Sequence, residues 1–154
     1  MSKLRAAMVL LAVAAATAAC HPDEPSGGKA PVGQAPAGGC RTEFLNPWRP
    51  VITSGRLIRG EAVSRCRQRP RSHTTTLTLE RQSPAGWETK DTETSSQIPT
   101  VQGITLLVLV DCAPGNWRLR AQVKVAWPYG VVQSPGDTSD ILKVRDRKDC
   151  EAPR

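Results

Sequence analysis

The stretch Ile104–Trp127, ITLLVLVDCAPGNWRLRAQVKVAW, decides which kind of fold this sequence can form. Apolar residues alternate with others on both sides of the segment Ala113-Pro114-Gly115-Asn116. Alternation at period two is typical of a β-strand with one buried face, because successive side chains point to opposite sides. The central residues favour turns, so the stretch predicts a hairpin. Its expected cross-strand pairs are Cys112 with Trp117, Val110 with Leu119 and Val108 with Ala121.

Several other segments also have the composition of strands. Thr74–Glu80 is rich in β-branched residues and alternates, which predicts a strand with Leu77 and Leu79 facing inward. Trp87–Thr94 is polar and predicts an edge strand, and Ser139–Asp146 predicts the last strand. No segment beyond residue 20 shows a helical period. We therefore expect an all-β chain, a single antiparallel β-sandwich that is immunoglobulin-like or related.

The first forty residues differ from the rest of the chain. Residues 1–19 contain a basic start, an apolar run over Ala6–Ala16 and small residues, which is the layout of a secretory signal. The ending Thr17-Ala18-Ala19-Cys20 resembles a bacterial lipobox, which implies lipidation of Cys20 and attachment to the cell membrane. The alternative is ordinary cleavage after Ala18 and a secreted soluble protein. Residues 20–39 are rich in Pro, Gly and Ala and predict a disordered tether, followed by one domain over 40–154.

The sequence has five cysteines, an odd number for an exported protein. Lipidation of Cys20 leaves four, which can form two disulfides in an oxidising compartment. We favour Cys66–Cys112 and Cys40–Cys150, and the pairing Cys40–Cys66 with Cys112–Cys150 remains open. A metal site is not expected, because the sequence has no C-x-x-C and His73 is the only histidine of the folded part. No cofactor is expected either.

The formal charge of +7 falls to +5 once residues 1–19, with Lys3 and Arg5, are removed. Such a charge favours anionic partners. Behind a signal sequence, nucleic acid is excluded as a partner, and an anionic envelope polymer, phospholipid head groups or an envelope protein fit better. The candidate anion-binding residues are Arg56, Arg59, Arg65, Arg67, Arg69 and Arg71.

No catalytic constellation stands out, so no catalytic residue is assigned. His73 is beside a basic loop without a G-x-S-x-G motif, which indicates a solvated loop histidine. Glu88, Asp91 and Glu93 gather on the polar strand, where they are expected to form a solvated edge that discourages strand pairing. Arg118 and Arg120, with Gln122 and Lys124, are expected on the solvated side of the sheet.

Two resemblances bear on function. The elements Cys112, Gly115, Trp117-Arg118 and a terminal Cys150 resemble small uncharacterised exported proteins of high-GC Gram-positive bacteria and their phages. The order Cys66, Trp87, Cys112 resembles that of immunoglobulin-like sandwiches. We hypothesise a non-enzymatic, membrane-tethered module that binds an envelope partner. The alternatives are a phage-encoded lipoprotein that excludes superinfection, which rests on the first resemblance, and a small envelope hydrolase. Oligomeric state does not follow from the sequence.

Overall fold

A computed structural model of the chain describes residues 39–45, 48–54, 56–133 and 136–151. The predicted signal, Cys20 and the tether up to residue 38 lie outside the described residues. The described part consists of strands and one short 3-10 helix. In chain order these are β1 (Cys40–Phe44), β2 (Val51–Ile52), β3 (Leu57–Cys66), β4 (Ser72–Ser83), β5 (Gly86–Ser95), β6 (Ile104–Asp111), β7 (Gly115–Trp127), β8 (Gly130–Gln133), β9 (Asp137–Thr138), β10 (Leu142–Val144) and η1 (Arg147–Cys150).

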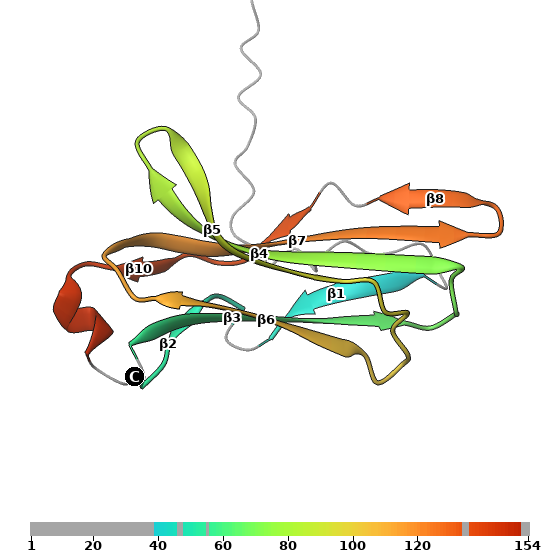
Figure 1. The fold of residues 1–154 in the computed structure, drawn as a ribbon, viewed down its shortest axis with the longest axis horizontal. Coiled ribbons are helices and arrows are strands. Elements are labelled where there is room, and N and C mark those ends of the chain that lie inside the picture. The colour runs from blue at the N-terminus through green and yellow to red at the C-terminus, as the bar shows by residue number, and fades with distance from the viewer. Residues whose placement is uncertain (1–38, 46–47, 55, 134–135, 152–154) are drawn as a thin grey trace, which may run out of the picture.

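The strands form two antiparallel sheets that pack face to face, which confirms the predicted β-sandwich (Figure 1). In the first sheet β3 is central, with β6 on one side and β1 and β2 along the other. In the second sheet β4 and β7 are central, and β5 is an edge strand beside β4. The strands β8, β9 and β10 follow one another along the other side of β7. The predicted edge strand at Trp87–Thr94 is thus confirmed as part of β5.

The predicted hairpin over Ile104–Trp127 is wrong, because β6 and β7 belong to different sheets. β6 pairs with β3 over eight residues, and β7 pairs with β4 over ten. The residues between them cross from one sheet to the other. The connection is held by Trp117, whose Nε1 donates to the Ala113 carbonyl at 2.9 Å, and by Arg81, which donates to the Pro114 carbonyl. The apolar faces of the two runs do meet, but across the core and not side by side in one sheet.

The core lies between the inward faces of β3 and β6 in one sheet and of β4 and β7 in the other. Leu77 and Leu79 of β4 are fully buried, as their alternation predicts. They belong to one cluster with Leu106 and Val108 of β6 and with Leu119 of β7. Gly60 of β3 faces this cluster, and a Cβ atom there would lie 2.1 Å from Leu119 Cδ2. The Leu119 side chain therefore occupies space on the opposite sheet that any side chain at residue 60 would fill.

The last part of the chain does not form the single strand predicted for Ser139–Asp146. It forms β9 and β10, which are separated by Ser139, Asp140 and Ile141. The Ser139 hydroxyl accepts a hydrogen bond from the Leu119 backbone N–H at 2.8 Å. A side chain thus replaces one backbone partner of β7 at the point where the edge strand is interrupted, so the edge of β7 remains hydrogen-bonded.

The free edge of β6 is covered by acidic side chains from β5. Asp91 Oδ2 accepts a hydrogen bond from the Leu109 backbone N–H at 2.8 Å, and a Glu93 carboxylate oxygen accepts one from the Leu107 N–H. Edge N–H groups that lack a strand partner invite pairing with another chain. The acidic residues of β5 therefore satisfy the backbone of the opposite sheet, a more specific role than the solvated edge that the sequence predicts.

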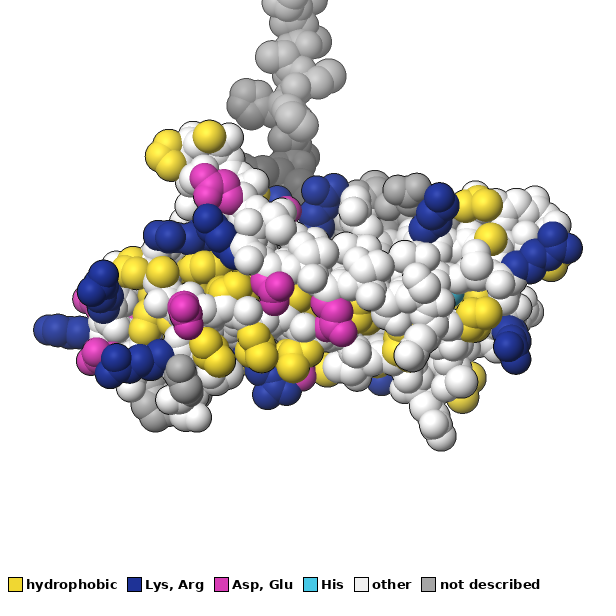
Figure 2. Space-filling view, in the orientation of Figure 1, with side chains coloured by type: hydrophobic (Ala, Val, Ile, Leu, Met, Phe, Trp, Pro, Cys, Tyr) yellow, Lys and Arg dark blue, Asp and Glu magenta, His cyan; other side chains and the backbone are white. Residues whose placement is uncertain are grey.

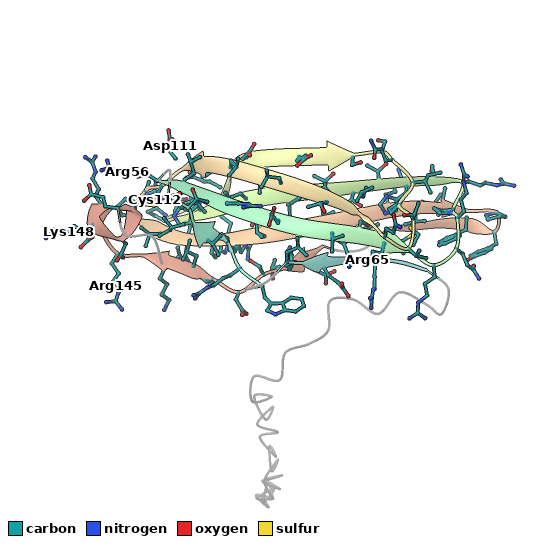
Figure 3. The ribbon with its side chains drawn as sticks, turned by 90° about the horizontal axis from the view of Figure 1, so that it is seen from below. Arg56, Arg65, Asp111, Cys112, Arg145 and Lys148 are labelled. Atoms are coloured by element: carbon teal, nitrogen blue, oxygen red, sulfur yellow. A yellow bond between two sulfur atoms is a disulfide. The ribbon has the colours of Figure 1, made fainter. Side chains whose placement is uncertain are left out.

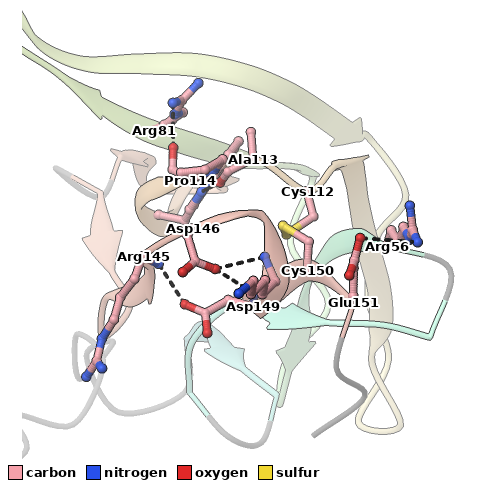
Figure 4. The surroundings of a disulfide bond; sticks show 12 residues. Arg56, Arg81, Cys112, Ala113, Pro114, Arg145, Asp146, Asp149, Cys150 and Glu151 are labelled. Carbon is pink, nitrogen blue, oxygen red and sulfur yellow. Dashed lines mark hydrogen bonds and ion pairs between the residues drawn. A yellow bond between two sulfur atoms is a disulfide. The ribbon is translucent and has the colours of Figure 1, made fainter.

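The disulfides are Cys40–Cys66 and Cys112–Cys150, so the favoured pairing is wrong and the alternative is correct. Cys40 and Cys66 lie directly opposite each other on β1 and β3, with Cα atoms 4.0 Å apart. Cys112 follows β6 and reaches Cys150 of η1, as Figure 4 shows. The favoured pairing places Cys112 at the tip of a hairpin, and that hairpin does not exist.

Trp117→Ala is expected to lower the free energy of unfolding by about 3–5 kcal/mol, the usual range for a buried Trp. Trp117 is 2 % exposed, and the variant loses both the packing of the indole ring against the core cluster and its hydrogen bond to the Ala113 carbonyl. Denaturant titration measures the change. Trp48→Ala is the control, because Trp48 is 46 % exposed and should cost well under half as much. Equal losses in the two variants would contradict the packing described above.

Candidate functional site

The six arginines predicted as an anion-binding group do not form one surface. Arg56 and Arg65 lie near opposite ends of β3, about 30 Å apart at the rise of an extended strand (Figure 3). Three of the six are paired with acids: Arg56 with Glu151 at 3.4 Å, Arg59 with Glu61, and Arg65 with Glu43 at 3.0 Å. The other three, Arg67, Arg69 and Arg71, lie on the exposed β3–β4 loop and pair with no carboxylate of the described residues.

His73 is buried, so its prediction as a solvated loop residue is wrong. It is the first inward residue of β4, and it is followed in the same alternation by Thr75, Leu77 and Leu79. Extending that alternation backward by one step would have placed His73 in the core. The prediction failed because the neighbouring Arg67–Arg71 loop suggested an exposed position.

The His73 imidazole belongs to a buried polar cluster between the two sheets. Its Nε2 lies 3.1 Å from Ser64 Oγ and 3.2 Å from Thr75 Oγ1. Thr42 Oγ1 donates to Ser64 Oγ at 3.0 Å. All four side chains are buried, and their hydroxyls satisfy one another. His73 Nδ1 is buried without a hydrogen-bond partner.

Ser64 and His73 have the separation of a nucleophile and its base, but the site lacks the other requirements of catalysis. Ser64 is 0 % exposed and His73 is 1 % exposed, so a substrate cannot reach either atom. No described carboxylate contacts Nδ1 to orient the ring. Burial lowers the pKa of His73. The Gln97 backbone raises this pKa, but by less than burial lowers it. The imidazole is therefore held in its neutral form, which suits a structural role in the core.

The same histidine lies close to one disulfide. The Sγ atoms of Cys40 and Cys66 and one imidazole nitrogen of His73 are all within 4.8 Å of one another. This is the one trio of described His, Cys, Asp and Glu residues close enough to hold a metal ion. The two sulfurs are bonded to each other, however, and a metal requires free thiolates. In the disulfide-bonded protein the trio is thus part of the core.

The outward side of the β5–β4–β7 sheet is an ordered polar surface, which we call the outer face. The register places Thr94, Thr76 and Gln122 in one row across the sheet, and Thr92, Thr78 and Arg120 in the next. Thr74 lies opposite Lys124 in a further row. Thr76 Oγ1 and Thr94 Oγ1 are 3.1 Å apart and share a hydrogen bond. The outer face consists of Thr74, Thr76, Thr78, Thr92, Thr94, Arg118, Arg120, Gln122 and Lys124.

One end of the outer face carries a stacked arginine. The Arg118 guanidinium lies 4.0 Å from the centre of the Trp87 ring, and its Nε donates to Glu80 at 2.7 Å. Glu80 is 6 % exposed, so this ion pair is partly shielded from water. Trp87 therefore packs on the outside of the sheet, and it does not cover a Cys66–Cys112 bridge as in the immunoglobulin-like arrangement. The cation–π contact and the ion pair together hold Arg118 flat against the sheet.

Comparison with known proteins identifies no relative of this chain. No protein-family model, no curated protein and no solved structure matches it. Among the described residues, no helix has the length and apolar character needed to cross a bilayer. The two disulfides fit an oxidising, extracytoplasmic compartment. Function must therefore be argued from the surface chemistry of the chain itself.

Because the pKa of His73 is lowered in the folded state, the protein is expected to lose stability at acidic pH. Above the pKa of an unfolded histidine, about 6.5, both states are neutral and His73 adds no pH dependence. Below it the unfolded state binds a proton that the folded state, with its lowered pKa, does not. The free energy of unfolding should then fall by at most about 1.4 kcal/mol per pH unit.

The measurement is denaturant titration between pH 7 and pH 5. His73→Gln should reduce the dependence of the free energy of unfolding on pH, whatever its effect on stability at pH 7. His21→Gln is the matched control, because His21 is the one other histidine of the chain and precedes the folded domain. An unchanged slope in His73→Gln would mean that His73 takes up its proton equally in both states.

Proposed function

We propose that this chain is a lipid-anchored, extracytoplasmic binding module without enzymatic activity, and that its outer face binds an anionic envelope polymer. The observation that carries the proposal is the outer face itself, where rows of threonine hydroxyls run into a column of basic and amide side chains on β7. The inaccessible Ser64–His73 pair supports a binding role over hydrolysis.

The anchoring part of the proposal rests on the sequence. The lipobox-like segment ending at Cys20 supplies a lipidation site, and residues 21–39 separate it from the domain. All four remaining cysteines are used in disulfides, which leaves Cys20 as the one cysteine without a partner in the chain. Lipidation gives this cysteine a role and explains why the total is odd.

The binding part rests on the geometry of the outer face. Neighbouring strands are about 4.8 Å apart and alternate residues on a strand about 6.8 Å apart, so the hydroxyls form a regular, flat array. A polymer of phosphate and polyol units offers acceptors to the hydroxyls and charges to the basic column. Figure 2 shows the upper middle of the molecule as largely uncharged polar surface with basic side chains to either side. Glu80 is the one acid in these rows, and it is already paired with Arg118.

Lys124→Glu is expected to weaken binding of soluble poly(glycerol phosphate) about tenfold, because an attractive contact becomes a repulsive one. Calorimetric titration of the full chain measures the affinity, with neutral dextran as the polymer control. Arg147→Glu makes the same charge change on η1, outside the outer face, and should leave affinity within about twofold. The proposal for the outer face fails if both variants lose affinity equally.

Intact-mass measurement of the protein isolated from its native host tests the anchor. The mass is expected to include a diacylglycerol addition at an N-terminal Cys20, and reduction should add two hydrogens for each of the two disulfides. An unmodified N-terminus at Ala19 would exclude the anchor, and it would leave the polymer-binding proposal to stand on its own.

A further inference from the structure

Three loops meet at the end of the sandwich where the chain enters the domain. Cys40 starts β1 there and is joined to Cys66 at the end of β3. The β3–β4 loop is fastened to β7 by a hydrogen bond from the Arg71 N–H to the Ala126 carbonyl at 2.8 Å. The β5–β6 loop is fastened through the Thr100 carbonyl, which accepts from the Cys66 N–H at 3.3 Å. We call this surface the tether end, defined by residues 66–72, 96–103 and 127–131.

The tether end is basic and contains no acid. Arg67, Arg69 and Arg71 are exposed on the β3–β4 loop. The surrounding sequence has no Asp or Glu in residues 62–79, 94–110 or 112–136. Figure 2 shows the corresponding right-hand end with basic and hydrophobic side chains and no acidic one on the face in view. Within the described residues, the three positive charges are therefore not paired with any carboxylate.

The tether end also exposes large apolar side chains. Tyr129 is 80 % exposed at the tip of the β7–β8 hairpin, Val131 is 61 % exposed and Val101 is 69 % exposed. The Tyr129 ring stacks on the buried Trp127 ring, with centroids 6.0 Å apart and planes within 3°. The tyrosine is thus supported from below while its outer side faces solvent. Aromatic and basic side chains together are typical of surfaces that sit in the head-group region of a bilayer.

The opposite end of the sandwich also carries basic residues, but there they are accompanied by an equal number of acids. Figures 3 and 4 show that the basic residues Arg56, Arg145 and Lys148 surround the Cys112–Cys150 disulfide together with acids. The Glu151 side chain pairs with Arg56, and Asp149 Oδ2 accepts a hydrogen bond from the Arg145 backbone N–H. The basic residues at this end are Arg56, Arg145, Arg147 and Lys148, and the acids are Asp111, Asp146, Asp149 and Glu151. Their charges cancel.

We propose that the tether end docks on the anionic surface of the membrane that holds the lipid of Cys20. This inference rests on the proposed anchor. Nineteen residues separate Cys20 from Cys40 and span at most about 65 Å, so an anchored domain always remains near the bilayer. The basic end is the one from which the tether leaves, so docking needs no reversal of the domain. Confinement by the anchor raises the effective concentration of lipid head groups near the domain. Three arginines and a tyrosine are then enough to keep the tether end on the membrane.

Docking fixes the orientation of the sandwich. The long strands run between the tether end and the opposite end (Figure 1), so the Cys112–Cys150 end points away from the bilayer. The outer face is then presented to the space above the membrane, where an envelope polymer is accessible. The lipid attaches the protein to the membrane, and the arginines of the β3–β4 loop determine which end of the sandwich faces it.

Vesicle co-sedimentation tests the proposal on the full chain carrying Cys20→Ser, so that the lipid is absent and every variant keeps the same N-terminal segment. The parent is expected to bind vesicles of phosphatidylcholine with phosphatidylglycerol more tightly than phosphatidylcholine alone, and added salt should weaken the difference. Changing Arg67, Arg69 and Arg71 together to Gln should lower the partition coefficient on anionic vesicles on the order of 100-fold. Tyr129→Ser should lower it further when combined with the triple change.

The matched control changes Arg145, Arg147 and Lys148 together to Gln, which removes the same charge at the opposite end. It should leave vesicle binding within about threefold, and thermal unfolding of both triples checks that they fold. Equal losses in the two triples, or binding that ignores anionic lipid, would overturn the docking proposal. Neither result affects polymer binding by the outer face or the mass of the anchor, because those are measured separately.

Discussion

The whole architecture depends on the packing of two alternating apolar faces across the gap between the sheets. β3 and β6 supply one face, and β4 and β7 supply the other. At the centre Leu119 occupies the space that Gly60 leaves open, at a distance that no side chain on β3 would permit. Any larger residue at position 60 would therefore push Leu119 or the sheets apart. The chain crosses from sheet to sheet after β6, so that β6 packs across the core against β4 and β5, and β7 packs against β3.

Because the chain leaves the first sheet after β6, one edge of β6 is left without a hairpin partner. β6 has β3 on one side and no strand of the described residues on the other, so its outward N–H groups need partners. Asp91 and Glu93 reach from β5 to supply them. The carboxylates join the two sheets along the side where both end, and they also block addition of a foreign strand. The acidic edge strand thus satisfies the backbone of the opposite sheet along this side of the sandwich.

The distribution of charge follows from the same framework. Residues of β3 that face outward alternate, so Arg59 and Arg65 are carried away from each other along the strand and find acids as partners. The loop after β3 carries three exposed arginines that pair with no described carboxylate, and it lies beside Cys40, where β1 begins. The outer face of the other sheet carries its cations in a column because β7 presents every second side chain on one side. The proposed polymer-facing surface therefore follows from strand alternation on β7, and the proposed membrane-facing surface follows from the loop after β3.

The sequence by itself determined what is local. Alternation identified Leu77 and Leu79 as inward residues, the polar edge strand, the fold class and the fact that β6 and β7 each bury one face. It failed where the outcome depends on which strands become neighbours. A period of two tells which side of a strand is buried but not whether its partner lies beside it or across the core. The hairpin, the disulfide pairing and the exposure of His73 were wrong for that reason. Only the tertiary structure decided them, because β6 pairs with β3 over eight residues and β7 pairs with β4 over ten, which places the two strands in different sheets.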